Sequence, residues 1–136
     1  MATEPRQAKL NMILNISGSS QPTKFERVQL DQFIQYRARF ISLHANFTSK
    51  ADAGIYQLST NIIDREKGNS NRIIAFIRLE RKQIHLEFTP TLSIWYKLRY
   101  RDISSAHFKL KSIASDEEVF FAEFACQIEI CENARI

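Results

Sequence analysis

The chain has 136 residues, a length that suits one domain and hardly two. Hydrophobic residues make up 44% and charged residues 25%, with only 3 Gly and 3 Pro, so the composition excludes disordered, collagen-like and linker-type chains. The 19 Lys and Arg exceed the 15 Asp and Glu, and a net charge of +4 is mildly basic without requiring a particular partner.

The beginning of the chain is polar, and residues 1–8 are expected to form a flexible arm ahead of a single β-sandwich domain over residues 9–136. From Leu10 onward, apolar residues recur with a period of two, and polar turn-forming residues interrupt them about every ten positions. This pattern predicts strands at residues 10–17 and 25–30. A helix would need apolar residues three and four positions apart, and no long window has them, so an all-β fold is expected.

A long extended segment follows at residues 36–47, and its apolar pattern changes phase. Tyr36 and Phe40 fall on one side of the predicted strand, whereas Leu43 and Phe47 fall on the other. Because side chains alternate strictly along a strand, a bulge, a bend or a passage between sheets is expected just after Phe40.

The remaining elements are also predicted as strands. Exposed loops are expected at residues 48–54 and 64–71, on either side of a strand at residues 55–63. The nearly unbroken apolar run 73–79 predicts a central strand buried on both sides. Further strands are expected at residues 84–88, 94–100, 106–113 and 120–130, and the last one places Phe120 on its inner face and Phe121 on its outer face. About eight or nine strands favour an antiparallel β-sandwich of the jelly-roll type.

No motif for catalysis or metal binding stands out. The three histidines, His44, His85 and His107, lie on separate predicted strands without HxH or HExxH spacing, so no metal site is expected. Cys126 and Cys131 share one predicted strand, which separates their Cα atoms by roughly 16 Å and argues against a disulfide. The sequence therefore predicts free thiols, which suit an intracellular location, no cofactor and no enzymatic activity.

Basic side chains beside an aromatic one suggest an interaction with nucleic acid. Such an arrangement suits a single strand, because phosphates meet the cations and bases stack on rings. The alternative is a solvated face, on which Glu123 and Glu129 of the last strand pair with lysines. The low net charge favours this alternative. The residues of the candidate polyanion-binding face are Trp95, Lys97, Arg99, Arg101, Lys109 and Lys111.

Large aromatic residues near predicted outer faces favour a protein–protein contact, because exposed apolar patches are usually covered. Trp95, Phe121 and Tyr100 are the residues expected there. The apolar run 73–77 supports association, and homo-oligomers are the commonest assemblies. A small barrel that carries an apolar ligand is a third alternative, suggested by the size and the 10 Phe residues.

The order of these segments also suggests a family. The long strand 36–47, the strand 55–63, a polar tip, the apolar run 73–79, the segment Phe88-Thr-Pro-Thr91 and a closing strand follow one another. In order and spacing they resemble small jelly-roll structural proteins of viruses, such as capsid, penton or minor-capsid subunits and the trimeric heads of attachment fibres.

The resemblance implies a structural or attachment role as a homo-oligomer, with a trimer favoured. Other virion or host proteins would be further partners. The expected location is the virion or the interior of the host cell (cytoplasm or nucleus). Neither a secretion signal nor a membrane span is expected from the sequence, because its apolar runs are short and interrupted.

Overall fold

The computed structural model describes residues 11–19, 23–63, 72–92 and 94–132. These residues contain strands and no helix, so the prediction of an all-β fold is confirmed. The predicted arm, 1–8, and the predicted tip, 64–71, lie outside the described residues. In chain order the strands are β1 (Asn11–Gly18), β2 (Thr23–Gln29), β3 (Tyr36–Ala51), β4 (Gly54–Thr60), β5 (Arg72–Leu79), β6 (Gln83–Phe88), β7 (Tyr96–Lys97), β8 (Asp102–Ala106), β9 (Phe108–Ser112), β10 (Glu118–Val119) and β11 (Phe121–Glu132).

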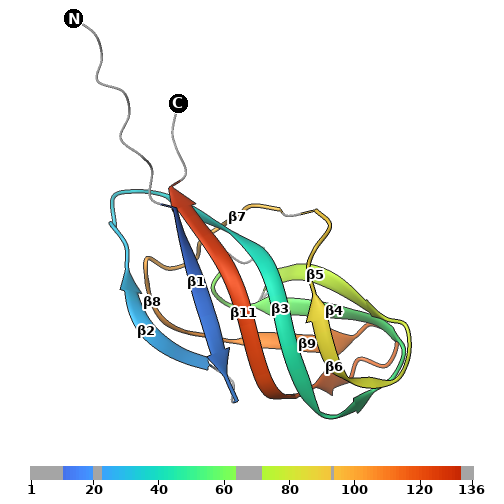
Figure 1. Cartoon of the computed structure of the whole chain (residues 1–136). Helices are drawn as coiled ribbons and strands as arrows, with labels where there is room; N and C mark the ends of the chain where they lie inside the picture. The colour runs from blue at the N-terminus through green and yellow to red at the C-terminus, as the bar shows by residue number, and fades with distance from the viewer. Residues whose placement is uncertain (1–10, 20–22, 64–71, 93, 133–136) are drawn as a thin grey trace, which may run out of the picture.

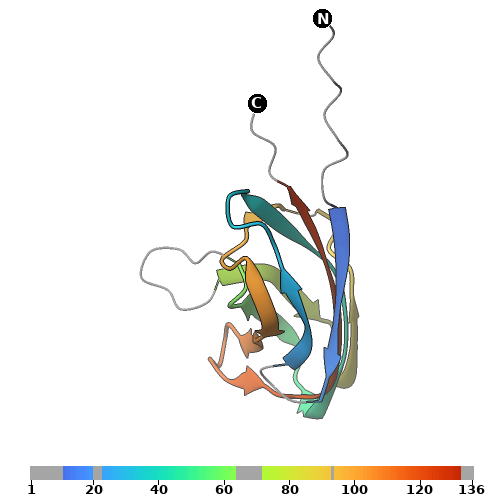
Figure 2. The ribbon, with the colours of Figure 1, turned by 90° about the vertical axis from the view of Figure 1, so that its left-hand side faces the viewer.

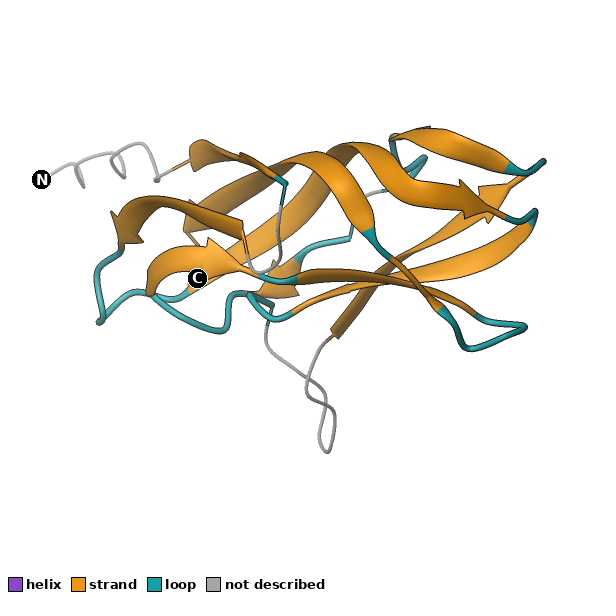
Figure 3. Cartoon of the chain, turned by 90° about the horizontal axis from the view of Figure 1, so that it is seen from below, coloured by secondary structure: helices purple, strands orange, loops and turns teal. Residues whose placement is uncertain are grey.

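The strands form two larger antiparallel sheets and one small pair (Figure 1). Sheet I has the order β1-β11-β3-β6, and the short β7 pairs with the beginning of β3. Sheet II has the order β10-β9-β4-β5, and β2 pairs with β8. Sheet II lies behind sheet I in Figure 1, and Figure 3 shows the two layers from below. This arrangement is consistent with a β-sandwich.

Aromatic side chains join the two sheets in the interior. Phe108 on β9 of sheet II meets Phe124 on β11 of sheet I, with ring centroids 4.9 Å apart. Phe124 also lies 5.0 Å from Phe121, which in turn lies 6.2 Å from Phe47 on β3. Burial of such apolar surface is the main favourable contribution to folding. Other fully buried side chains are Ile16, Leu43, Leu58, Ile62, Ile77, Leu110, Ile128 and Ile130.

The change of phase predicted in the long strand is a bulge at Ile41. In the pairing of β3 with β11, Phe40 is opposite Ile128 and Ser42 is opposite Gln127, which leaves Ile41 as an extra residue. The bulge restores the alternation, so that the apolar residues before and after it are buried in the same interior. The strand therefore remains in one sheet.

A second irregularity places Phe121 in the interior, and the prediction that it faces outward is wrong. Phe121 is opposite Phe47, whereas Glu123 is opposite Asn46, so the register shifts around Ala122. One extra residue in β11 changes which side chains face the interior on one side of the register shift. As a result Phe121 is 8% exposed and Phe120 is 60% exposed, the reverse of the predicted faces.

The apolar run of β5 forms an edge strand, and the prediction of a central strand buried on both sides is wrong. β5 pairs with β4 and ends the strand order of sheet II. Ile77 and Leu79 are buried, but Ile73 and Phe76 are 40% and 60% exposed. β5 therefore has apolar side chains on both faces, but only one of these faces is buried.

Three other predicted segments differ in extent. β3 continues to Ala51, which reduces the predicted loop 48–54 to a short turn at residues 52–53, and Gly54 begins β4 with a positive φ of 150°. The predicted strand 94–100 is reduced to the two residues of β7. The predicted strand 106–113 corresponds to β9, and the preceding strand β8 is absent from the sequence prediction.

The β2–β8 pair lies beside β1, on one side of the two large sheets (Figure 2). Arg27 links the two strands, because its Nε and Nη2 donate to the carboxylate oxygens of Asp102 at 2.7 and 2.5 Å. These hydrogen bonds favour the ionised carboxyl and lower the pKa of Asp102. The edges formed by β5 and by β6 lie on a different side of the molecule from this pair.

We expect a maleimide reagent to modify Cys131 in the native protein and to leave Cys126 intact. Cys126 is 3% exposed, and burial raises the pKa of its thiol, so little of the reactive thiolate forms. Cys131 is partly exposed. Peptide mass spectrometry should find the adduct on Cys131 in native buffer and on both residues in denaturant. Equally fast labelling of both native thiols would contradict the burial of Cys126.

Candidate functional site

The three residues predicted at a partner contact occupy different environments. Phe121 belongs to the core and is not available at the surface. Trp95 is half-buried, and the guanidinium carbons of Arg37 and Arg39 lie 4.9 and 5.0 Å from the centroid of its ring. Tyr100 is 44% exposed. Trp95 and Tyr100 therefore each lie against at least one arginine.

The residues of the predicted basic face are divided between the two sheets. Lys97 lies on β7 in sheet I, and Arg99 follows it with its guanidinium 4.9 Å from the centroid of Tyr100. Lys109 and Lys111 lie on β9 in sheet II. Arg101 donates through its Nε to the carbonyl oxygen of Ile34 at 2.7 Å. The structure therefore does not gather these five cations on one surface.

The predicted pairing of the lysines with the last strand is wrong. Lys109 lies 3.9 Å from Glu118, and Lys111 lies 2.8 Å from Asp116, near β10. Glu129 binds Arg39 in sheet I instead, with 2.6 Å between Nε and Oε1. The reason is topological, because β9 and β11 belong to different sheets.

Arg37 and Arg39 are the basic residues that the sequence analysis omitted. They alternate with the buried Tyr36, Ala38 and Phe40 on β3, so their side chains lie on the outer face of sheet I. The same alternation is visible in the sequence. What the sequence did not reveal is that β7, with Trp95 just before it, pairs with this part of β3.

Polar side chains join neighbouring strands across the outer face of sheet I. Gln127 on β11 donates through Nε2 to Asn15 Oδ1 on β1 at 2.9 Å. The Oε1 atom of the same amide accepts a hydrogen bond from Ser42 on β3 at 3.4 Å. These hydrogen bonds satisfy polar side chains of three neighbouring strands on this face.

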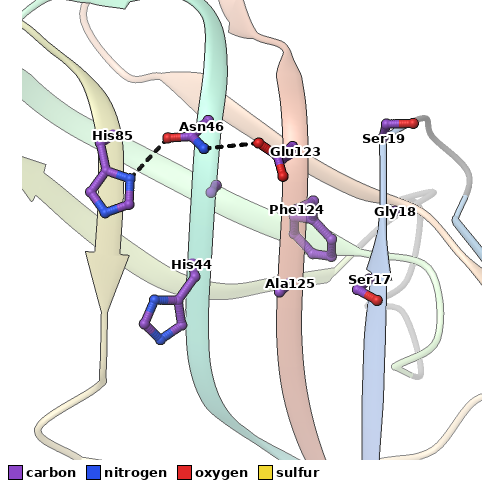
Figure 4. A pocket seen from close by; sticks show the side chains of 10 residues that line it. Ser17, Gly18, Ser19, His44, Asn46, His85, Glu123, Phe124 and Ala125 are labelled. Carbon is purple, nitrogen blue, oxygen red and sulfur yellow. Dashed lines mark hydrogen bonds between the residues drawn. The ribbon is translucent and has the colours of Figure 1, made fainter.

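A shallow groove of about 460 Å³ lies at one end of this polar face (Figure 4). Asn46 lies between His85 and Glu123, at 2.9 and 3.2 Å, so three strands contribute to one hydrogen-bonded row. His44 and His85 both face Glu87, at 3.4 and 3.5 Å. No group of three or more His, Cys, Asp or Glu side chains suited to a metal ion occurs within the described ranges.

The outer face of sheet II carries large exposed apolar side chains among charged ones, since Arg78 is opposite Ile55 and Lys111 is opposite Gln57. Four large apolar side chains, Ile55, Ile73, Phe76 and Ile113, form what we call the apolar face, and they are 47%, 40%, 60% and 47% exposed. Ile73 and Phe76 are opposite the small or polar residues Ser59 and Gln57 of β4. The backbone of Ile113 donates to Ile55 at 3.0 Å, which brings the strand end of β9 beside β4.

The apolar face continues into a groove beside β5, the side groove, which has a volume of about 360 Å³. The connection from β6 to β7 forms its other wall, and there Leu92 and Ile94 are 79% and 55% exposed. The sequence pointed to association through residues 73–77, but it gave no indication that residues from 88–92 and 94–96 lie against them. The lining residues are Ile73, Ile74, Ala75, Phe76, Phe88, Pro90, Thr91, Leu92, Ile94 and Tyr96.

Comparisons with known proteins do not assign a family. No protein-family description, no curated protein and no solved structure matches this chain. Across the described residues no helix is long and apolar enough to cross a membrane. The surfaces described above are therefore the basis for a functional proposal.

Proposed function

We propose that this protein is a non-enzymatic β-sandwich that associates with copies of itself through sheet II. The observation that carries the proposal is the apolar face, on which Phe76 is 60% exposed at the edge of the sheet. Large apolar side chains that are exposed together on one face often mark a contact with another molecule. The hydrogen-bonded outer face of sheet I provides the contrast within the same molecule.

The edge strand itself favours a second copy as the partner. Residues 73–77 of β5 include no charged residue and no proline, the features that commonly protect an exposed edge from pairing. An antiparallel copy of β5 would offer complementary backbone groups and an identical apolar face about a two-fold axis. Such a contact is self-complementary without requiring a different protein.

The charges around the apolar face are also compatible with a copy of the same chain. Arg78 lies 3.5 Å from Glu80, and the two lysines of β9 have Glu118 and Asp116 as neighbours. Because each of these cations has an acidic neighbour, two such faces would approach each other with little electrostatic repulsion.

The biological role that we propose is structural. The resemblance of strand order implies a jelly-roll connectivity and a role in a viral capsid or in attachment. Its partners would then be other virion or host proteins inside the host cell. The resemblance also suggests a trimer, whereas two-fold pairing of β5 would give a dimer.

Analytical ultracentrifugation across the micromolar range tests the proposal. We expect the wild-type protein to sediment as a dimer or larger oligomer. The substitution Phe76→Lys should weaken association by about 2 kcal/mol or more, roughly thirtyfold, because it places a charge in the centre of the contact. A wild-type protein that remains monomeric throughout would contradict the proposal, and a trimer would replace the two-fold pairing with a heterologous contact.

A matched control separates the apolar face from the effect of added charge. Ile13 is 48% exposed on β1 of sheet I, so Ile13→Lys adds the same charge at a similarly exposed position. We expect this variant to associate like the wild type. Equal loss of association in both variants would show that the contact does not depend on sheet II.

A further inference from the structure

β5 forms an edge of sheet II, but only part of this edge is regular. Among the described strands β5 pairs with β4 alone. In that pairing the register shifts between Leu58 and Ser59, which leaves Ile74 of β5 as an extra residue in a bulge. A bulge interrupts the ladder and bends the strand, so this part of the edge is a poor partner for another strand. Residues 75–79 remain as the regular part of the edge.

The side chains of residues 75–79 alternate between the two faces of sheet II. Ile77 and Leu79 are buried, whereas Phe76 is 60% exposed on the apolar face. Arg78 lies on the same face as Phe76, opposite Ile55 of β4, and its side chain is 72% exposed. The exposed side of the regular edge therefore carries one aromatic ring and one guanidinium, two positions apart.

Two-fold pairing of this segment with a second copy allows few registers. When the axis is perpendicular to the sheet, both copies turn the same face outward, so outer residues are opposite outer residues. With the axis at Ile77, all five residues of the segment 75–79 have partners from the same segment. With the axis at Phe76 or Arg78, only three of them do, because the others meet the bulge or lie beyond the end of β5.

The exposed side chains favour the same register. An axis at Ile77 places Phe76 of each copy opposite Arg78 of the other, where Cβ atoms are about 4.5–5.5 Å apart. A guanidinium within about 6 Å of an aromatic ring is attracted to the face of the ring. An axis at Arg78 would instead place two like charges opposite each other. With the axis at Ile77 the two arginines are only diagonal neighbours, and each has Glu80 of its own chain at 3.5 Å.

From these observations we propose that two copies join through residues 75–79, with Ile77 on the two-fold axis and Arg78 of each copy against Phe76 of the other. Arg78 is then a specificity-determining residue, because it selects a register that apolar contact alone leaves open. The inference rests on the proposed self-association, to which it adds the register of the two copies and the side chains that meet.

Cysteine cross-linking tests the register in a background that carries Cys131→Ser, because the thiol of Cys131 is partly exposed. Directly opposite residues of antiparallel strands have the Cα separation that a disulfide requires, whereas diagonal residues, about 7–8 Å apart, do not. We expect mild oxidation to cross-link a mixture of the Phe76→Cys and Arg78→Cys variants, and neither variant alone. The mixed dimer keeps one of the two contacts between Phe76 and Arg78. Non-reducing electrophoresis measures the cross-linked fraction.

A control on the neighbouring strand distinguishes edge pairing from stacking of two apolar faces. Ile55 is 47% exposed on β4, and Ile55→Cys should give no cross-link, because β5 separates this position from the partner copy. Cross-linking of Ile55→Cys, or of Phe76→Cys or Arg78→Cys alone, would overturn the register and leave the self-association in place. A wild-type dimer without cross-linking in the mixture would do the same. A wild-type protein that sediments as a monomer would overturn the self-association and the register together.

Sedimentation of charge variants tests the contact of Arg78 with Phe76 independently. Arg78→Gln should weaken the dimer about fivefold, because two exposed cation–π contacts are lost. In a Phe76→Leu background the same substitution should change Kd less than about twofold, because the ring is already absent. The control Lys50→Gln removes one positive charge from an exposed position of β3 in sheet I, and it should associate like the wild type. Equal effects of Arg78→Gln with and without the ring would overturn the contact.

Discussion

The substitution Phe108→Ala is expected to lower the free energy of unfolding by about 3–5 kcal/mol. Phe108 is 1% exposed and its ring lies 4.9 Å from that of Phe124, so the contact joins sheet II to sheet I. Alanine would remove the apolar contact and leave a cavity that strands fixed by their hydrogen bonds cannot close. Denaturant unfolding at one fixed protein concentration measures the change, since self-association would add to the apparent stability.

Two further variants make this result specific to the contact between the sheets. Phe33 is 86% exposed, so Phe33→Ala should change stability by no more than about 0.5 kcal/mol. In a double-mutant cycle, Phe108→Ala and Phe124→Ala should be coupled by about 0.5–1.5 kcal/mol. Strictly additive effects would show that the two rings, and hence the two sheets, do not meet as described.

The period-two pattern was sufficient to predict the fold class, because alternation directly reflects one buried and one solvated face. It also located the bulge at Ile41, since a change of phase within one strand has few structural explanations. The second bulge, around Ala122, left no such signal. Phe120 and Phe121 are adjacent and equally apolar, so either one fits the inner face until the register with β3 is known.

The candidate sites were harder to predict, because they depend on which strands are neighbours. Lys97 and Lys109 are close in sequence but belong to different sheets, whereas Arg37 and Trp95 are far apart in sequence and in contact. The edge position of β5 was not predicted for the same reason, because it depends on which strands are neighbours. Its apolar composition indicated something to be covered, but only the strand order shows that β5 lies at the edge of sheet II.

The two adjacent phenylalanines at the start of β11 provide the second large effect. We expect Phe121→Ala to lower the free energy of unfolding by about 3–5 kcal/mol, because its ring is 8% exposed and packs between Phe47 and Phe124. Phe120→Ala should cost no more than about 0.5 kcal/mol, because its side chain is 60% exposed. Both changes remove the same side chain from neighbouring positions, and denaturant unfolding compares them directly.

This comparison tests the bulge around Ala122 and no other feature of the fold. Simple alternation along β11 would bury Phe120 together with Phe124 and would expose Phe121, so it predicts the opposite order of the two effects. A larger loss for Phe120→Ala would mean that the shift between Phe121 and Glu123 is absent. Phe121 would then lie on the outer surface, where it would again be a candidate for contact with a partner.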